Sequence, residues 1–200
     1  KYDAKVFFSK VDDAIKHGYK YIYAYYPDPD ATLHGCGNYS KETSNTIKSI
    51  NDNLEQLVKN NPDVLFISIA DHGHIDIKLC SLDEHSDLYD TLATPYFCEA
   101  RAGMINIKKG REKEFEKLFD KYYKEHFELY SKKEIVEKQI FGYSTNYCHD
   151  YDKILGDYLM VSKDKYTLFF ENYDSSGMLS THAGGTEREG LINISVYNNL

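Results

Sequence analysis

The chain has 200 residues and a mass of 23.2 kDa, which is enough for one ordinary globular domain with a substantial core. Apolar residues make up 42% and charged residues 28%, with only 4 Pro and 12 Gly, so collagen-like, low-complexity and largely disordered chains are excluded. The net charge of −8 opposes binding to nucleic-acid polymers and anionic membranes, and no stretch approaches the roughly 20 apolar residues that span a bilayer. We therefore expect neither a nucleic-acid polymer nor a membrane as a partner.

Residues 4–17 repeat their apolar side chains at a spacing near 3.6, which predicts an amphipathic helix that ends at Gly18. Residues 19–26 are dense in Tyr, Ile and Ala, which predicts a strand. Two prolines then break this strand and start a loop that carries Asp30 and His34.

Ser40 is a typical N-cap, and the apolar stripe that follows it predicts a long helix to about residue 60. Residues 63–70 form a nearly continuous apolar run, which is typical of a strand buried on both faces. Helix, strand, helix and strand with short connections predict an α/β architecture with parallel crossovers. Ligands in such sheets bind beyond the carboxyl ends of the strands, where the loops after residues 26 and 70 both lie.

The middle of the chain changes character, and we expect a small α+β insertion over residues 96–143 between the core segments 1–95 and 144–200. The expected elements of the insertion are strands at 102–107 and 127–130 and helices at 109–123 and 132–138. The last third predicts two strands in hairpin-like succession, 158–162 and 166–171, and a further strand at 192–197.

The cysteines are widely separated and form no C-x-x-C pair: Cys36, Cys80, Cys98 and Cys148. Sparse cysteines of this kind favour a reducing compartment, so we expect a cytoplasmic protein. Because the chain opens on Lys1 and holds no Met before Met104, we also expect it to be a fragment of a longer protein. A missing signal peptide says little about export in such a chain.

Aspartate and histidine recur where the predicted strands end. Asp30 and His34 follow the first strand, and Asp71 and His72 follow the second directly. Carboxylate oxygen and imidazole nitrogen form a donor set that suits zinc. The alternatives are an Asx-turn aspartate with a surface histidine in the first loop and a turn-capping pair in the second. His74 is as compatible with a solvent-facing position as with a contact to substrate or to a carboxylate.

Three motifs in this order resemble a known family. The pattern Y-x-x-P-D-x-x-x-H-x-x-G begins at Tyr26, the strand at 63–70 ends in A-D-H-G, and T-H-A-G-G-T-E-x-E begins at Thr181. Together they resemble the alkaline phosphatase superfamily, close to its nucleotide pyrophosphatase/phosphodiesterase branch. The patterns R-A-x-x-x-x-x-K-x-G at 101–110 and L-G-D-Y-L at 155–159 recur in bacterial members. The resemblance implies an alkaline-phosphatase-like, mostly parallel sheet flanked by helices.

The resemblance also implies two divalent metal ions, zinc in the first place, that flank a phosphoryl group. One ion would be held by Asp30, His34 and His182, and the other by Asp71 and His72. A further aspartate and the nucleophilic Thr or Ser of the family belong to earlier segments, and we find neither in this chain. We therefore expect no catalytic nucleophile here and no turnover by the fragment alone.

The activity implied is metal-dependent hydrolysis of phosphate esters through a covalent intermediate, by a phosphodiesterase or nucleotide pyrophosphatase that acts on a small phosphate ester or a nucleotide. The alternatives are a phosphomonoesterase, a phosphonate hydrolase or a mutase of the same superfamily, and a non-catalytic metal-binding or association module. Monoesterases often use arginine to bind the extra phosphate charge, and the only arginines are Arg101, Arg111 and Arg188, which favours diesters. The oligomeric state is not predicted.

Overall fold

The structure is a computed structural model, and it describes residues 3–144, 149–169 and 176–197. The chain divides into two compact units. The first comprises Lys1–Asp76, Gly177–Thr181 and Leu191–Leu200, and the second comprises Ile77–Ser176 and His182–Gly190. No helix in the described ranges is long and apolar enough to cross a membrane.

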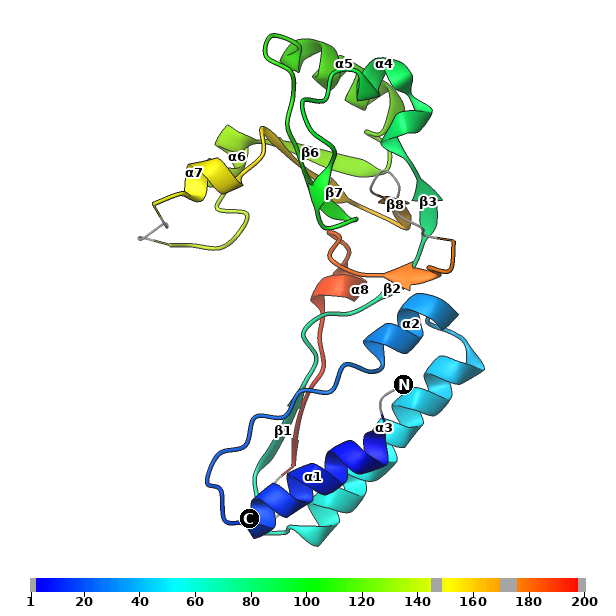
Figure 1. The fold of residues 1–200 in the computed structure, drawn as a ribbon, viewed down its shortest axis with the longest axis vertical. Helices are drawn as coiled ribbons and strands as arrows, with labels where there is room; N and C mark the ends of the chain where they lie inside the picture. Colours follow the sequence, from blue (N-terminus) through cyan, green and yellow to red (C-terminus); the bar gives the residue numbers. More distant parts are fainter. Residues whose placement is uncertain (1–2, 145–148, 170–175, 198–200) are drawn as a thin grey trace. The chain divides into compact units, whose positions relative to one another are not determined.

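The first unit combines helices with short strands (Figure 1). Its helices are α1 (Ala4–Lys16), α2 (Asp30–Cys36) and α3 (Lys41–Asn60), and its strands are β1 (Phe66–Ile69), β2 (Ile75–Asp76), β9 (Ser180–Thr181) and β10 (Ile194–Tyr197). Strand β1 pairs with β10 and β2 pairs with β9, both antiparallel. Residues more than a hundred positions apart therefore meet twice in this unit.

The two long helices confirm the predictions from apolar spacing and capping residues. Asp3 caps α1 by accepting hydrogen bonds from the amides of Lys5 and Val6 at 2.8 and 3.2 Å. Ser40 caps α3 in the same way and accepts from the amide of Thr43 at 3.0 Å. The helices lie side by side in Figure 1, and the α3 end is joined to α1 by a hydrogen bond from Asn61 to Asp12 of 2.8 Å.

The strands of the first unit correct three expectations. Residues 19–26 form no strand in the structure, so the expected parallel crossover is absent from the described chain. Residues 63–70 contain β1, which forms a two-stranded sheet with β10. One face of this pair is exposed, so β1 is not buried on both faces as expected. On that face lie four side chains that are each between 60% and 62% exposed: Ile67, Ile69, Ile194 and Val196.

The second unit contains a larger sheet. Its strands are β3 (Lys78–Cys80), β4 (Phe97–Cys98), β5 (Ala102–Ile105), β6 (Phe127–Ser131), β7 (Tyr158–Ser162) and β8 (Tyr166–Leu168). Its helices are η1 (Leu82–Glu84), α4 (Ser86–Tyr89), α5 (Glu112–Tyr122), α6 (Lys132–Glu137), α7 (Tyr151–Ile154) and α8 (Glu187–Gly190). The order β4-β5-β7-β6 forms an antiparallel sheet, and β3 pairs with β8 in parallel.

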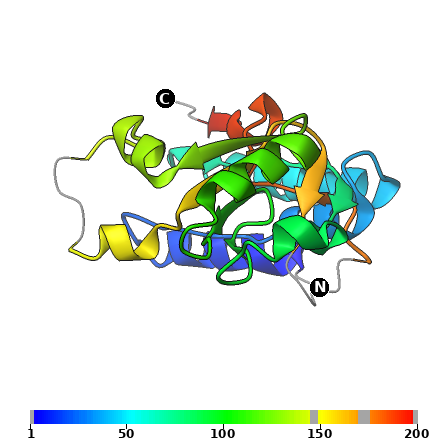
Figure 2. The ribbon, with the colours of Figure 1, turned by 90° about the horizontal axis from the view of Figure 1, so that it is seen from above.

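The sheet of the second unit has an apolar core on each face, because successive side chains of a strand point to opposite sides. Along β7, Met160 packs into one core and Leu159 into the other. Helix α5 covers the first face with Phe115 and Phe119, and α6 covers the second with Ile135 (Figures 1 and 2). The elements predicted at 102–107, 109–123, 127–130 and 132–138 are thereby confirmed.

Strand pairing in the second unit differs from the predictions. The strands at 158–162 and 166–171 do not form a hairpin, because β7 pairs with β5 and β6 while β8 pairs with β3. Residues 170 and 171 lie outside the described residues. The expected insertion 96–143 lies within the second unit, which takes in more of the chain because its sheet includes β7. The mixed α/β class is confirmed, but β3–β8 is the only parallel pair in the described chain, so the sheets are not mostly parallel.

Candidate metal centre

Helix α2 brings Asp30 and His34 to one face of the first unit. The sequence predicted a loop here because two prolines precede these residues, but proline is well tolerated at a helix start and α2 begins directly after Pro29. Residues four apart on a helix are neighbours. The Nε2 atom of His34 lies 3.3 Å from Oδ1 of Asp30. The spacing D-x-x-x-H is therefore a helical spacing in this protein.

The segment between β1 and β2 adds two more histidines to this face. Nε2 of His74 lies 2.7 Å from Oδ1 of Asp30, and Nε2 of His72 lies 3.9 Å from the same oxygen. The side chain of His74 is 3% exposed, so it does not face solvent. Three imidazole rings from two segments thus converge on one carboxylate oxygen.

Ser180 of β9 orients two of these rings. Its carbonyl oxygen lies 2.8 Å from Nδ1 of His34, and its hydroxyl oxygen lies 3.1 Å from Nδ1 of His74. The same hydroxyl donates to the carbonyl of Leu33 at 2.8 Å. A carbonyl only accepts, and the hydroxyl proton is already used, so both Nδ1 atoms are assigned as donors. Nε2 of His34 then carries the lone pair, as in histidines that bind metals, while Nε2 of His74 forms a hydrogen bond of 2.7 Å with Oδ1 of Asp30.

His72 is arranged in the same way. Its Nδ1 atom lies 3.1 Å from the carbonyl oxygen of Gly73, which assigns the proton to Nδ1 and the lone pair to Nε2. Nε2 of His72 lies 3.6 Å from Oδ1 of Asp71, and that carboxylate accepts from the amide of His72 at 3.1 Å. Asp71 and His72 therefore form a second carboxylate and imidazole pair beside the first.

Asp76 holds α2 in place relative to β2. Its Oδ1 atom accepts from the backbone and side-chain nitrogens of Asn38 at 2.8 and 3.0 Å. Gly37, which ends α2, has a φ of +79°, and a Cβ there would lie 3.3 Å from the same oxygen. A hydrogen bond of 2.8 Å from the amide of Leu179 to the carbonyl of His34 joins α2 to the segment that leads into β9. The ligand-bearing helix is thus fixed at both strands.

The donor set fits a divalent metal ion. Asp30, His34 and His74 each offer one ligand atom, and these atoms lie within 4.8 Å of one another. One carboxylate oxygen with imidazole nitrogens is a set that zinc binds, and each ring is oriented by a partner on its other nitrogen. The chemistry of the residues and their second hydrogen bonds both suit such an ion.

The predicted site residues are distributed over both units. Asp30, His34, Asp71 and His72 lie together in the first unit. His182 follows Thr181 of β9 by one peptide bond, and the two units divide at this bond, so its membership of the ligand set stays a prediction. The sequence analysis did not select His74. The spacing H-x-H was an available signal, because alternate residues of an extended segment face the same side.

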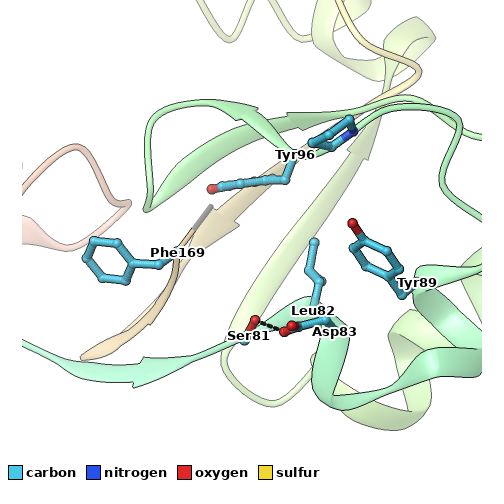
Figure 3. A pocket seen from close by; sticks show the side chains of 7 residues that line it. Ser81, Leu82, Asp83, Tyr89, Tyr96 and Phe169 are labelled. Atoms are coloured by element: carbon cyan, nitrogen blue, oxygen red, sulfur yellow. Dashed lines mark hydrogen bonds between the residues drawn. The ribbon is translucent and has the colours of Figure 1, made fainter. Parts of the chain in front are cut away.

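The second unit contains a separate pocket, shown in Figure 3. Its lining includes the rings of Tyr89, Tyr96 and Phe169 and a hydrogen bond from the Ser81 hydroxyl to the carboxylate of Asp83. None of the predicted ligands lines it. The pocket has no cluster of imidazoles and carboxylates among its described residues, so we assign it no part in the metal chemistry.

The chain matches a known family over most of its length. The model of the family described as type I phosphodiesterase / nucleotide pyrophosphatase matches residues 1–186. A search of curated proteins found no match. Among solved structures, murine ectonucleotide pyrophosphatase / phosphodiesterase 5 is similar with a TM-score of 0.74 at 17% identity, over 99% of this chain and 54% of that one.

Two further structures of ectonucleotide pyrophosphatase / phosphodiesterase 5 are similar to this chain to nearly the same degree. An inactive variant of the murine protein in complex with AMP gives a TM-score of 0.71 at 17% identity, over 100% of this chain and 54% of that one. The human protein gives 0.70 at 18% identity, over 99% and 54%. At these identities the likeness shows the fold, which is alkaline-phosphatase-like as predicted. The chain spans about half the length of the structures it matches.

Proposed function

Because this chain belongs to the type I phosphodiesterase / nucleotide pyrophosphatase family, a branch of the alkaline phosphatase superfamily, we propose that it carries metal ligands of a phosphate-ester hydrolase. The substrates are phosphodiesters or nucleotide pyrophosphates in the first place. The observation that carries this proposal is the convergence of the His34, His72 and His74 Nε2 atoms on Asp30. A surface that only binds protein needs no such arrangement.

We assign the ligands to two zinc ions. Asp30 and His34 would hold the first ion together with His182, and Asp71 and His72 would hold the second. His74 helps to position the ligands of the first ion, because its Nε2 atom forms a hydrogen bond of 2.7 Å with the Asp30 carboxylate. When bound, a pair of such ions polarises phosphoryl oxygens and stabilises the negative charge of the attacking and leaving oxygens.

The residues of this chain have a positioning role in that chemistry. Ser180 and Gly73 hold the three rings through hydrogen bonds from their Nδ1 atoms, and the Nε2 atoms lie 2.7 to 3.9 Å from Oδ1 of Asp30. The nucleophilic Thr or Ser, and the covalent intermediate that it would form, are proposed to come from a segment outside these 200 residues. The cytoplasmic location likewise stays a prediction.

The preference for diesters is supported by the state of the arginines. A monoester carries extra negative charge, which an exposed guanidinium binds well. Arg101 is fully buried, and Arg111 forms an ion pair of 2.7 Å with Glu114. Two of the three arginines are therefore already engaged within the protein, whereas Arg188 is exposed on α8, so the preference for diesters is based on Arg101 and Arg111.

Metal binding is tested first on the chain itself. Zinc affinity is measured by competition with a chromophoric chelator for the wild type, Asp30→Asn, His34→Ala and the control His17→Ala, whose ring is exposed at the end of α1. We expect the two site variants to lose affinity at least tenfold and the control to lose none. Equal affinities in all four proteins would refute the ligand assignment.

Hydrolysis is tested on the protein that contains this chain, with zinc added. Bis(p-nitrophenyl) phosphate represents the diesters and p-nitrophenyl phosphate the monoesters, each with and without a chelator. We expect chelator-sensitive cleavage with a higher kcat/KM for the diester. Cleavage of neither substrate would favour the non-catalytic binding module, and preferential cleavage of the monoester would overturn the diester assignment.

A further inference from the structure

Arg101 and Glu189 form a buried ion pair in the second unit, with side-chain exposures of 0% and 2%. The pair is bidentate, with Nε to Oε1 at 2.6 Å and Nη2 to Oε2 at 2.9 Å. The remaining donors bind Thr167 Oγ1 and the carbonyls of Tyr166 and Asp164 at 2.9, 3.1 and 2.6 Å. All five N–H groups of the guanidinium are thereby satisfied within the protein. Arg101 therefore acts on the protein rather than on a ligand.

The carboxylate of Glu189, which Arg101 holds in place, also binds the segment 183–186. Oε1 accepts from the amide of Gly184 at 2.7 Å, and Oε2 accepts from the hydroxyl of Thr186 at 2.6 Å. Burial acts to raise the pKa of Glu189, but hydrogen bonds from Arg101, Thr186 and Gly184 outweigh burial and lower the pKa below its usual value. The side chain is thus an ionised acceptor with four donors around it.

The backbone of the segment 183–186 also lies against the ion pair. A Cβ at Gly184 would lie 2.6 Å from Nη2 of Arg101 and 2.8 Å from Oε2 of Glu189. Ala183 has a φ of +73°, and the amide of Gly185 donates to the carbonyl of Ser162 at 2.8 Å. The segment therefore has little room to change its conformation while the pair is intact.

We propose that the Arg101–Glu189 pair positions His182 for metal binding by fixing the backbone that follows it. The amide of Gly184, two residues after His182, is bonded directly to the pair. An apolar pair of similar size would pack as well, but it could not hold the Gly184 amide and the Thr186 hydroxyl. A zinc–nitrogen bond of about 2.0–2.1 Å demands a narrow range of ring positions, so a mobile backbone lowers affinity. The inference rests on the proposed role of His182 as a ligand.

The test measures zinc affinity of the 200-residue chain by competition with a chromophoric chelator. Gly184→Ala places a methyl group against the guanidinium, and Thr186→Val removes one hydrogen bond to Glu189 with little change of shape. We expect each variant to bind zinc roughly 10-fold to 100-fold more weakly than the wild type. Gly190→Ala is the matched control, because a Cβ there meets no atom within 4 Å, and we expect it to bind like the wild type.

A second series repeats both variants in a His182→Ala background, with circular dichroism of the metal-free proteins as the check on folding. If the pair acts through His182, Gly184→Ala and Thr186→Val cause no further loss once that ring is absent. A loss that persists in the His182→Ala background would indicate general damage to the fold and overturn the proposal. Wild-type affinity in both single variants, while His182→Ala weakens binding, would refute the positioning role alone. If His182→Ala itself binds zinc like the wild type, the ligand assignment and this inference both fail.

Discussion

Gly103→Ala is expected to destabilise the second unit because β5 has no room for a methyl group at this position. A Cβ at Gly103 would lie 1.8 Å from Cε2 and 1.9 Å from Cζ of Tyr96, less than half of the roughly 4 Å at which carbon atoms pack. The Tyr96 ring, which is 5% exposed and donates to the carbonyl of Glu99, must leave its place. Its lost burial costs about 1.5–3 kcal/mol and its hydrogen bond about 1 kcal/mol, while the lower chain entropy of alanine returns about 0.5–1 kcal/mol. The free energy of unfolding should therefore fall by about 1.5–3.5 kcal/mol.

Urea unfolding followed by far-UV circular dichroism measures this loss as a lower midpoint. Gly177→Ala is the control, since a Cβ there meets no atom within 4 Å, and it should change the free energy of unfolding by less than about 0.5 kcal/mol. In a Tyr96→Ala background the clash is absent, so Gly103→Ala should cost little or nothing. An equal cost in the wild-type and Tyr96→Ala backgrounds would show that the ring contact is not the cause, and the reasoning would be refuted.

Three further predictions concern the site, a thiol and the buried ion pair. Ser180→Ala removes the hydroxyl that bonds to His74 but keeps the carbonyl that bonds to His34. Zinc affinity in the chelator competition should fall about tenfold. An unchanged affinity would exclude a contribution from His74. Burial raises the pKa of the Cys80 thiol to about 12. At pH 8 a disulfide reagent should therefore label the exposed Cys98 in the folded chain and leave Cys80 unlabelled, which peptide mass spectrometry measures. Labelling of both cysteines at the same rate would contradict this prediction. The folded pKa of Glu189 lies below its usual 4.5, so its contribution to stability is complete above pH 4.5 and is lost as the pH falls through the folded pKa. The urea midpoints of the wild type and Glu189→Gln should therefore converge on acidification. A constant gap between the midpoints from pH 7 to pH 3 would count against the ionised pair.

The parts of the fold that the sequence predicted are those set by local spacing. Helices α1, α3, α5 and α6 follow from apolar periodicity and capping residues, which act within a few positions of the chain. Strand partners depend on residues far apart, and here the local patterns misled. β7 and β8 are neighbours in sequence but join different sheets: β7 pairs with β5 and β6, and β8 pairs with β3.

The site was predictable to a similar degree. The sequence analysis expected Asp30, His34, Asp71 and His72 to meet, and the structure brings them together. Only Asp71 and His72 follow a strand, because the strand expected before Asp30 does not form. The helix α2 was missed because it has only seven residues and follows two prolines, so periodicity had too few turns to act on. The role of His74 depends on the distant Ser180, which no local pattern connects with it.

The open face of the β1–β10 ribbon has a practical consequence for work with this chain. Four branched aliphatic side chains lie on it as two cross-strand pairs, Ile67 with Val196 and Ile69 with Ile194. Attraction between such patches strengthens on warming within the ordinary laboratory range. Concentrated solutions should therefore turn cloudy when warmed and clear again when chilled, well below the temperature at which either unit unfolds. The variant Ile67→Lys should stay clear under the same conditions.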